Sequence, residues 1–100
     1  MDKLKYCFDI DGVISNQTFK HDYWNYTPVI EVINKINKLY DDGHYILLYT
    51  ARGTESGIDW YQFTLTQMNN WGVKYHKLMM GKPSYDIIID DKAINIKDWL

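Results

Sequence analysis

Two aspartates one residue apart, Asp9 and Asp11, follow a short apolar stretch near the beginning of the 100-residue chain and precede Gly12. Residues 4–8 include tyrosine and phenylalanine, a composition typical of a buried strand. In an extended chain alternate side chains share one face, so both carboxylates are expected to point the same way. Their mutual repulsion would be relieved by a divalent cation or a transferred proton. Taken alone, the stretch fits a turn with solvated acids equally well.

Polar side chains also border two later apolar runs, at residues 45–49 and 85–89. These side chains are Thr50 after the first run, Lys82 before the second, and Asp90 and Asp91 after the second. Ligands of α/β domains bind beyond the carboxyl ends of the strands, where these residues are expected to meet. Oxygen ligands without histidine or cysteine favour Mg²⁺, and a hydroxyl and an ammonium group can hold phosphate oxygens.

Apolar spacing predicts two helices between the strands. Thr27 as N-cap and Pro28 as first helical residue mark the beginning of one helix, and Gly43 marks its C′ position. The other helix carries an apolar stripe over residues 58–68 and ends before Gly72.

Strands are predicted at residues 4–8, 45–49, 74–78 and 85–89, and residues 92–100 form a short tail with one last strand or helical turn. Alternation of strands and helices is typical of an α/β domain with a parallel sheet. We therefore expect a three-layer, Rossmann-like parallel sheet flanked by helices, in one domain over residues 1–100.

Composition argues against two classes of partner. The net charge of −2 at pH 7 argues against general nucleic-acid binding, which needs a basic face. No apolar run approaches the length of a membrane span, and no signal-peptide apolar region is expected at the N-terminus. The one cysteine, Cys7, lies within the first apolar run. It is expected to be a small core residue of a cytoplasmic protein.

Taken in order, these polar stretches resemble the four motifs of the haloacid dehalogenase (HAD) superfamily of phosphohydrolases. The matching residues are Asp9-Ile10-Asp11-Gly12-Val13, then Thr50, then Lys82, then Asp90-Asp91. Each motif is weak alone, but the ordered set is specific and spans nearly the whole chain. The resemblance implies a HAD-type core in which the first strand is central, between the strand before Thr50 and the strand before Asp90.

The resemblance also implies a role for each matching residue. Asp9 would be the nucleophile that forms an aspartyl-phosphate and a ligand of Mg²⁺. Asp11 would be the general acid and then the general base, with its backbone carbonyl at the metal. The remaining roles are phosphoryl binding for Thr50 and Lys82, direct Mg²⁺ ligation for Asp90 and ligation through water for Asp91.

HAD enzymes often carry a cap domain after the first or the second motif. Here residues 14–26 leave room only for a flap, whose aromatic side chains could close over a ligand, and residues 52–75 are used up by one helix and the beginning of a strand. We expect a capless member, whose open site takes a bulky substrate or is covered by another subunit of a homo-oligomer. Arg52 could bind a substrate phosphate or carboxylate, or form a structural pair with a nearby acid.

Residues 50–53, 59–60, 71–73 and 81–86 are also similar to small bacterial HAD proteins associated with capsule and lipopolysaccharide genes, which are taken to be phosphatases of sugar phosphates. The expected function is a Mg²⁺-dependent phosphomonoester hydrolase that forms an aspartyl-phosphate on Asp9 and acts on a phosphorylated sugar or related small metabolite. Two alternatives stay open: transfer of the phosphoryl group to an acceptor other than water, and a non-catalytic HAD-fold binding protein. A response-regulator receiver domain fits least, because its adjacent acidic pair follows the first strand.

Overall fold

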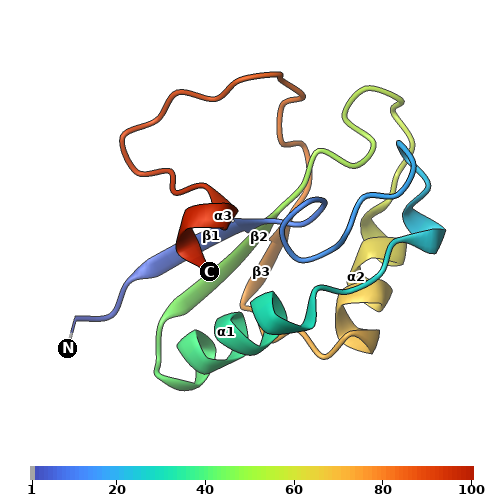
Figure 1. Ribbon diagram of the computed structural model, residues 1–100. Coiled ribbons are helices and arrows are strands. Elements are labelled where there is room, and N and C mark those ends of the chain that lie inside the picture. Colours follow the sequence, from blue (N-terminus) through green and yellow to red (C-terminus); the bar gives the residue numbers. More distant parts are fainter. Residues whose placement is uncertain (1) are drawn as a thin grey trace.

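The computed structural model describes residues 2–100 and contains one parallel sheet. Its strands are β1 (Lys5–Asp9), β2 (Tyr45–Tyr49) and β3 (Lys77–Met79), in the order β1-β2-β3 (Figure 1). The register places Asp9 opposite Tyr49. The predicted strand at 45–49 is confirmed, and those at 4–8 and 74–78 are confirmed with shifted ends. All strands point the same way, so their carboxyl ends meet at one edge of the sheet.

The helical elements are η1 (Tyr23–Asn25), α1 (Ile30–Asp41), α2 (Tyr61–Asn70) and α3 (Ile96–Trp99). Gly43 follows α1 with φ +95°, as predicted for a C′ glycine. The predicted beginning of α1 at Thr27 is wrong, because Val29 is the N-cap residue. Thr27 is held instead by Asn16, whose backbone N–H donates to the Thr27 carbonyl at 2.9 Å. This pairing with the flap keeps the segment before α1 extended.

The core lies on one face of the sheet. Phe8, Leu48 and Leu78 stand side by side in the strand register and are buried against α1, α2 and the turn after β1. The alternate residues of the strands point to the other face of the sheet, where they are exposed or half-buried and lie outside the core. These residues are Lys5, Cys7, Tyr45, Leu47, Tyr49, Lys77 and Met79. Within residues 2–100, therefore, the expected third layer does not form. Cys7 is exposed, so its prediction as a core residue is wrong.

The predicted strand at residues 85–89 does not form. Residues 80–95 contain no helix or strand and arch away from the sheet before the chain returns at α3 (Figure 1). Because this segment pairs with nothing, β1 is an edge strand, and its expected central position is wrong. The β-branched composition of residues 87–89 shows that they can form a strand, but it does not supply a partner. No helix within residues 2–100 is long and apolar enough to cross a bilayer.

Candidate active site

A tight turn follows β1 and directs Asp11. The carbonyl of Ile10 accepts hydrogen bonds from three successive N–H groups, those of Val13, Ile14 and Ser15, at 2.8–3.1 Å. Gly12 has φ +90°, which a residue with a side chain adopts only with strain. The extended strand thus ends at Asp9, and its alternation does not continue to Asp11.

The Asp9 carboxylate lies at the carboxyl end of β1 and is partly open to solvent. Its Oδ1 accepts from the Ile10 backbone N–H at 2.8 Å, and its Oδ2 accepts from Lys82 Nζ at 3.0 Å. The Asp9 side chain is 36% exposed and that of Lys82 15%. A carboxylate held by two donors yet reachable from solvent is a suitable oxygen nucleophile.

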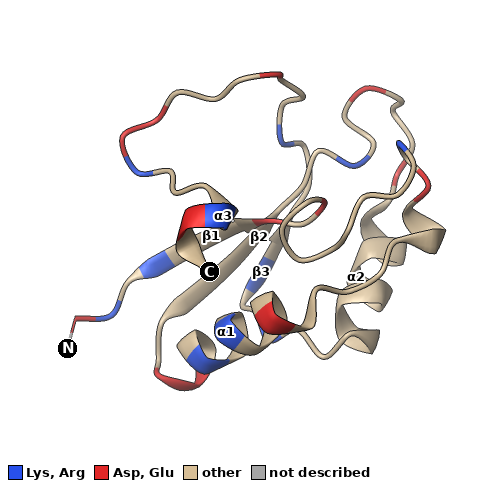
Figure 2. Ribbon diagram, in the orientation of Figure 1, with Lys and Arg blue, Asp and Glu red and all other residues tan. Residues whose placement is uncertain are grey.

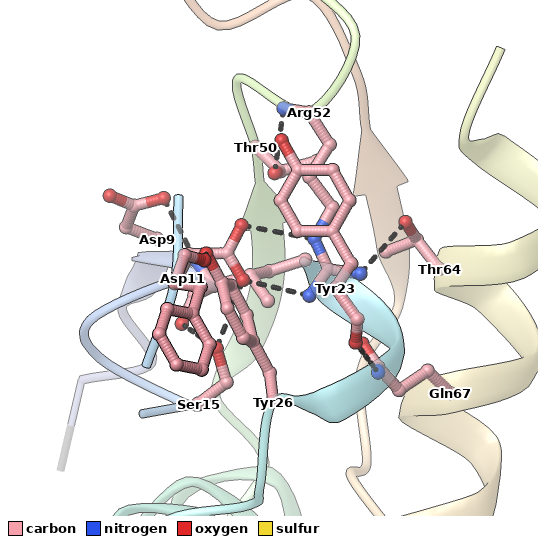
Figure 3. A network of polar contacts seen from close by, with 11 residues as sticks. Asp9, Asp11, Ser15, Tyr23, Tyr26, Thr50, Arg52, Thr64 and Gln67 are labelled. Carbon is pink, nitrogen blue, oxygen red and sulfur yellow. Dashed lines mark hydrogen bonds and ion pairs between the residues drawn. The ribbon is translucent and has the colours of Figure 1, made fainter. Parts of the chain in front are cut away.

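Asp11 is paired with a different cation. Arg52 Nη2 donates to Asp11 Oδ1 at 2.7 Å, and Arg52 Nε donates to Oδ2 at 3.0 Å (Figure 3). Ser15 Oγ donates to Oδ1 at 2.9 Å. Bidentate pairing fixes the plane of a carboxylate as well as its position. Asp11 is therefore a rigid carboxylate beside the Asp9 nucleophile candidate.

Arg52, the chain's one arginine, is enclosed on all sides. Its side chain has no exposed area, its Nη1 donates to Thr64 Oγ1 at 3.2 Å, and the Tyr23 ring lies 4.5 Å from Cζ (Figure 3). Every guanidinium nitrogen thus has a partner within the chain. The structural pair with a nearby acid is the arrangement found, while substrate binding by Arg52 stays a prediction, since Arg52 also lines the cavity described below.

Thr50 and Lys82 meet at the edge where Asp9 lies. Lys82 N–H donates to the Thr50 carbonyl at 3.0 Å, which places the lysine beside the end of β2. Thr50 is buried and its Oγ1 accepts from the Arg52 backbone N–H at 3.1 Å, so its hydroxyl proton stays available to another acceptor. Burial alone would lower the pKa of Lys82, but hydrogen bonds to Tyr85 and Asp9, and the charge of Asp9, raise it.

A cavity of about 500 Å³ opens over Asp9 and Asp11. Its walls come from the flap, the loop after β2 and the segment before α2, and its aromatic lining is Phe19, His21, Tyr23, Tyr26 and Trp60. Burial and the charge of Asp11 raise the pKa of Tyr23 and of Tyr26, so both phenols stay protonated at neutral pH. The cavity combines carboxylates at its floor with ring faces at its sides, which suits a polar ligand that carries a ring.

The structure does not bring the four expected Mg²⁺ ligands together. Asp90 and Asp91 are exposed on the 80–95 segment, and Figure 2 shows this acidic stretch apart from the acidic turn after β1. Asp90 Oδ1 accepts only from the Lys92 backbone N–H, at 2.7 Å. In the described part of the chain, no three acidic, histidine or cysteine side chains converge. One chain alone therefore does not fit the metal.

Three residues of the site had no role in the sequence prediction: Ser15, Tyr23 as the cover of Arg52, and Thr64. Thr64 carries the clearest signal, because it lies one helical turn before Met68 on the buried face of α2 and is itself fully buried. A buried hydroxyl on a helix requires a polar partner, which here is Arg52. Ser15 and Tyr23 lie in the flap, where sequence periodicity gives no orientation.

No protein-family model and no curated protein matches the chain. Among solved structures, the chain is similar to the crystal structure of an MCSG target from Vibrio cholerae, with a TM-score of 0.86 and 24% sequence identity. The match covers 95% of this chain and 85% of that chain. At this identity the likeness concerns the fold alone, and it agrees with a small α/β domain.

Proposed function

We propose that the chain is a phosphomonoester hydrolase of the capless HAD type, with Asp9 as the nucleophile. The observation that carries the proposal is the ion pair of Asp9 with Lys82 at 3.0 Å, in which Asp9 lines the cavity together with the rigid carboxylate of Asp11. An ammonium group beside the nucleophile neutralises the negative charge of the phosphoryl group in the transition state of its transfer.

The reaction uses two displacements at phosphorus. In the first, an Asp9 carboxylate oxygen forms a bond to phosphorus, the bond to the leaving oxygen breaks, and a proton from Asp11 passes to that oxygen. In the second, Asp11 takes a proton from water, the water oxygen bonds to phosphorus, and the Asp9–phosphorus bond breaks to release phosphate. To act as the acid, Asp11 must carry a proton, for which Oδ2 has a lone pair left because it accepts only from Arg52 Nε. To act as the base, it needs no rearrangement.

Lys82 and Thr50 serve the phosphoryl oxygens in this proposal. Lys82 supplies a positive charge from the side of β3, and the Thr50 hydroxyl supplies a hydrogen-bond donor from the end of β2. Mg²⁺ is proposed as cofactor, and bound at the Asp9 carboxylate it would add Lewis-acid charge. The roles of Asp9, Asp11, Thr50 and Lys82 do not depend on it, because the carboxylates of a single chain do not converge in the described residues.

The proposed substrate is a phosphorylated sugar or a related small metabolite. The volume of about 500 Å³ accommodates a monosaccharide phosphate, and the aromatic walls offer faces for a pyranose ring. The flap supplies most of the aromatic lining, so it takes the place of a cap domain in contacting the leaving group.

Phosphate release from a panel of sugar and nucleotide phosphates tests the proposal. Wild type is expected to turn over at least one compound in Mg²⁺, and Asp9→Asn to turn over none. Asp41→Asn is the matched control, since Asp41 is exposed at the end of α1 and pairs with Lys74. A phosphoryl adduct on the peptide that contains Asp9, found by mass spectrometry after acid quench, is an independent readout. Loss of turnover in both variants, or in neither, would contradict the proposal.

A phosphotransferase would use the same aspartyl-phosphate but a different acceptor. The two reactions are separated by comparing inorganic phosphate released with substrate consumed, in the presence of alcohols and sugars as acceptors. Equal amounts indicate a hydrolase. A deficit of phosphate that is matched by a new phosphorylated product indicates a transferase.

A further inference from the structure

The segment at residues 80–95, here called the arm, exposes an apolar run that soluble domains normally bury. Ile87, Ile88 and Ile89 are 80%, 53% and 96% exposed. Both ends of the arm are fastened to the chain's own fold: at its beginning Thr54 Oγ1 donates to the Lys82 carbonyl, and after its end the Trp99 ring packs on Phe8 at 5.2 Å. The arm is therefore held outward with a strand-forming segment at its middle.

The outer edge of β1 is an unpaired strand edge. Leu4 directs both its N–H and its carbonyl to the β2 side, because they bond His44 Nδ1 and the Tyr45 N–H. Successive residues of a parallel strand alternate in this direction, so the backbone groups of Lys5, Cys7 and Asp9 face outward. Such an edge readily accepts an added strand.

The arm of the same chain is too short to take that place with its acids at the site. Lys82 donates to the Thr50 carbonyl on the β3 side of β2, where Thr50 N–H also bonds Met79. Suppose that the arm lies on the outer edge of its own β1, with Asp90 level with Asp9. Ile87 would then lie about 13 Å from Lys82 along the strand direction and about 14 Å from it across the sheet. That straight path is about 19 Å, whereas five fully extended residues span at most about 18 Å.

We propose that the arm of one copy adds as a strand to the outer edge of β1 in a second copy. The exchange is mutual, because each copy has one arm and one open edge, and a two-fold axis satisfies both. No refolding of either copy is needed, since the arm already points outward.

The exchange completes the site. In the register that levels Asp90 with Asp9, the acidic pair of one copy reaches the end of β1 in the other, beside its Asp9. The carboxylates of Asp90 and Asp91 in one copy would then meet the Asp9 carboxylate and the Asp11 backbone carbonyl of the other, and together they would supply oxygen ligands for Mg²⁺. This part rests on the proposed function, whereas the strand exchange does not.

The mass in solution tests the exchange without reference to activity. Light scattering is expected to give the mass of two chains, against 12.0 kDa for one. Ile89→Asp is expected to give monomers with an unchanged circular dichroism spectrum, because Ile89 is 96% exposed and packs on nothing in its own chain. Ile94→Asp, at a residue 67% exposed outside the apolar run, is the matched control and should stay dimeric. A monomeric wild type, or a dimeric Ile89→Asp, would overturn the proposal.

Thiol cross-linking distinguishes exchange from docking of the arm on its own sheet. The proposed register levels Ile88 with the exposed Cys7, so Ile88→Cys treated with a short bismaleimide should give a covalent dimer on a denaturing gel. The product should disappear in Cys7→Ser, Ile88→Cys, and Ile94→Cys should give only background. An internally linked monomer would show that the arm lies on its own β1 and would overturn the exchange.

Mixed dimers test the shared site. Asp9→Asn and Asp90→Asn are each expected to be inactive, yet mixing them after partial unfolding and refolding should restore about a quarter of wild-type turnover, since half of the dimers are mixed and each has one intact site. Sites built from a single chain would stay inactive in the mixture. If wild type itself shows no turnover, the proposed function fails, and the mass and cross-linking results still decide the exchange.

Discussion

Arg52 holds both carboxylate oxygens of Asp11, through Nη2 at 2.7 Å and Nε at 3.0 Å, although the two residues are 41 positions apart. The pair joins the turn after β1 to the loop after β2, the two segments that carry the candidate site. Neither group contacts bulk solvent freely, since the Asp11 side chain is 12% exposed and that of Arg52 not at all. The geometry of the candidate general acid and base therefore depends on one guanidinium group.

Removing the guanidinium should destabilise the fold strongly. Arg52→Met leaves the poorly exposed Asp11 carboxylate without its cation, and we expect the free energy of unfolding to fall by about 3–5 kcal/mol. Urea denaturation followed by fluorescence measures this change. Lys74→Met is the control, because it breaks an exposed pair with Asp41 and should cost less than about 1 kcal/mol. Equal losses in the free energy of unfolding of the two variants would show that the Arg52–Asp11 pair stabilises the fold no more than an exposed pair does.

Arg52→Lys tests the positioning of Asp11 under the proposed function. Lysine keeps the charge but cannot form the bidentate contact, so we expect kcat to fall by about 10- to 100-fold with a smaller change in KM. Steady-state kinetics on the best phosphate ester gives the two values separately. A rise in KM with unchanged kcat would instead indicate that Arg52 binds substrate directly.

Thr64→Val should leave a buried hydrogen-bond donor of Arg52 without its acceptor. The substitution keeps the shape of the side chain but leaves Arg52 Nη1 without its acceptor, at a cost of about 1–3 kcal/mol in the free energy of unfolding. Thr66→Val is the control, because Thr66 lies on the exposed face of α2. It should change the free energy of unfolding by less than about 0.5 kcal/mol. Thermal or urea unfolding of both variants makes the comparison, and equal stabilities would show that water replaces the Thr64 hydroxyl.

Gly53→Ala should be far more damaging than Gly57→Ala. Both glycines have positive φ, +83° and +74°, but a Cβ at residue 53 would lie 2.1 Å from the Ile58 carbonyl oxygen, whereas residue 57 faces open space. We expect a loss of about 1 kcal/mol for Gly57→Ala from backbone strain alone. For Gly53→Ala we expect more than about 2 kcal/mol, because the loop must also move. Denaturation midpoints of the two variants test this ordering.

The ion pair of Lys82 with Asp9 should give stability a specific dependence on pH. The folded-state pKa of Lys82 is raised above its ordinary 10.5, so the contribution of the pair to the free energy of unfolding is complete below that value. The contribution is lost as the pH rises through the folded-state pKa. The stability difference between wild type and Lys82→Met should therefore be constant from about pH 7 to about pH 10 and should shrink above it. A difference that stays constant at higher pH would contradict the raised pKa.

Local sequence signals determined most of the elements. The apolar run at 45–49 became β2, the glycine after α1 took its expected C′ position, and the polar residues that follow β1 and β2 lie at one edge of the sheet. These features depend on neighbours within a few residues, through side-chain periodicity and backbone conformation, and such interactions can be read along the chain.

Tertiary structure alone decided which groups pair. Nothing near Arg52 in the sequence indicates that it meets Asp11 rather than a ligand, because that contact depends on how two loops 41 residues apart approach each other. Residues 87–89 have strand-forming composition, yet they stay unpaired because a strand needs an edge within reach, and the path of the chain from Lys82 leads away from β1. Composition indicates which secondary structure a segment can form. The lengths and directions of its connections determine which partner it can reach.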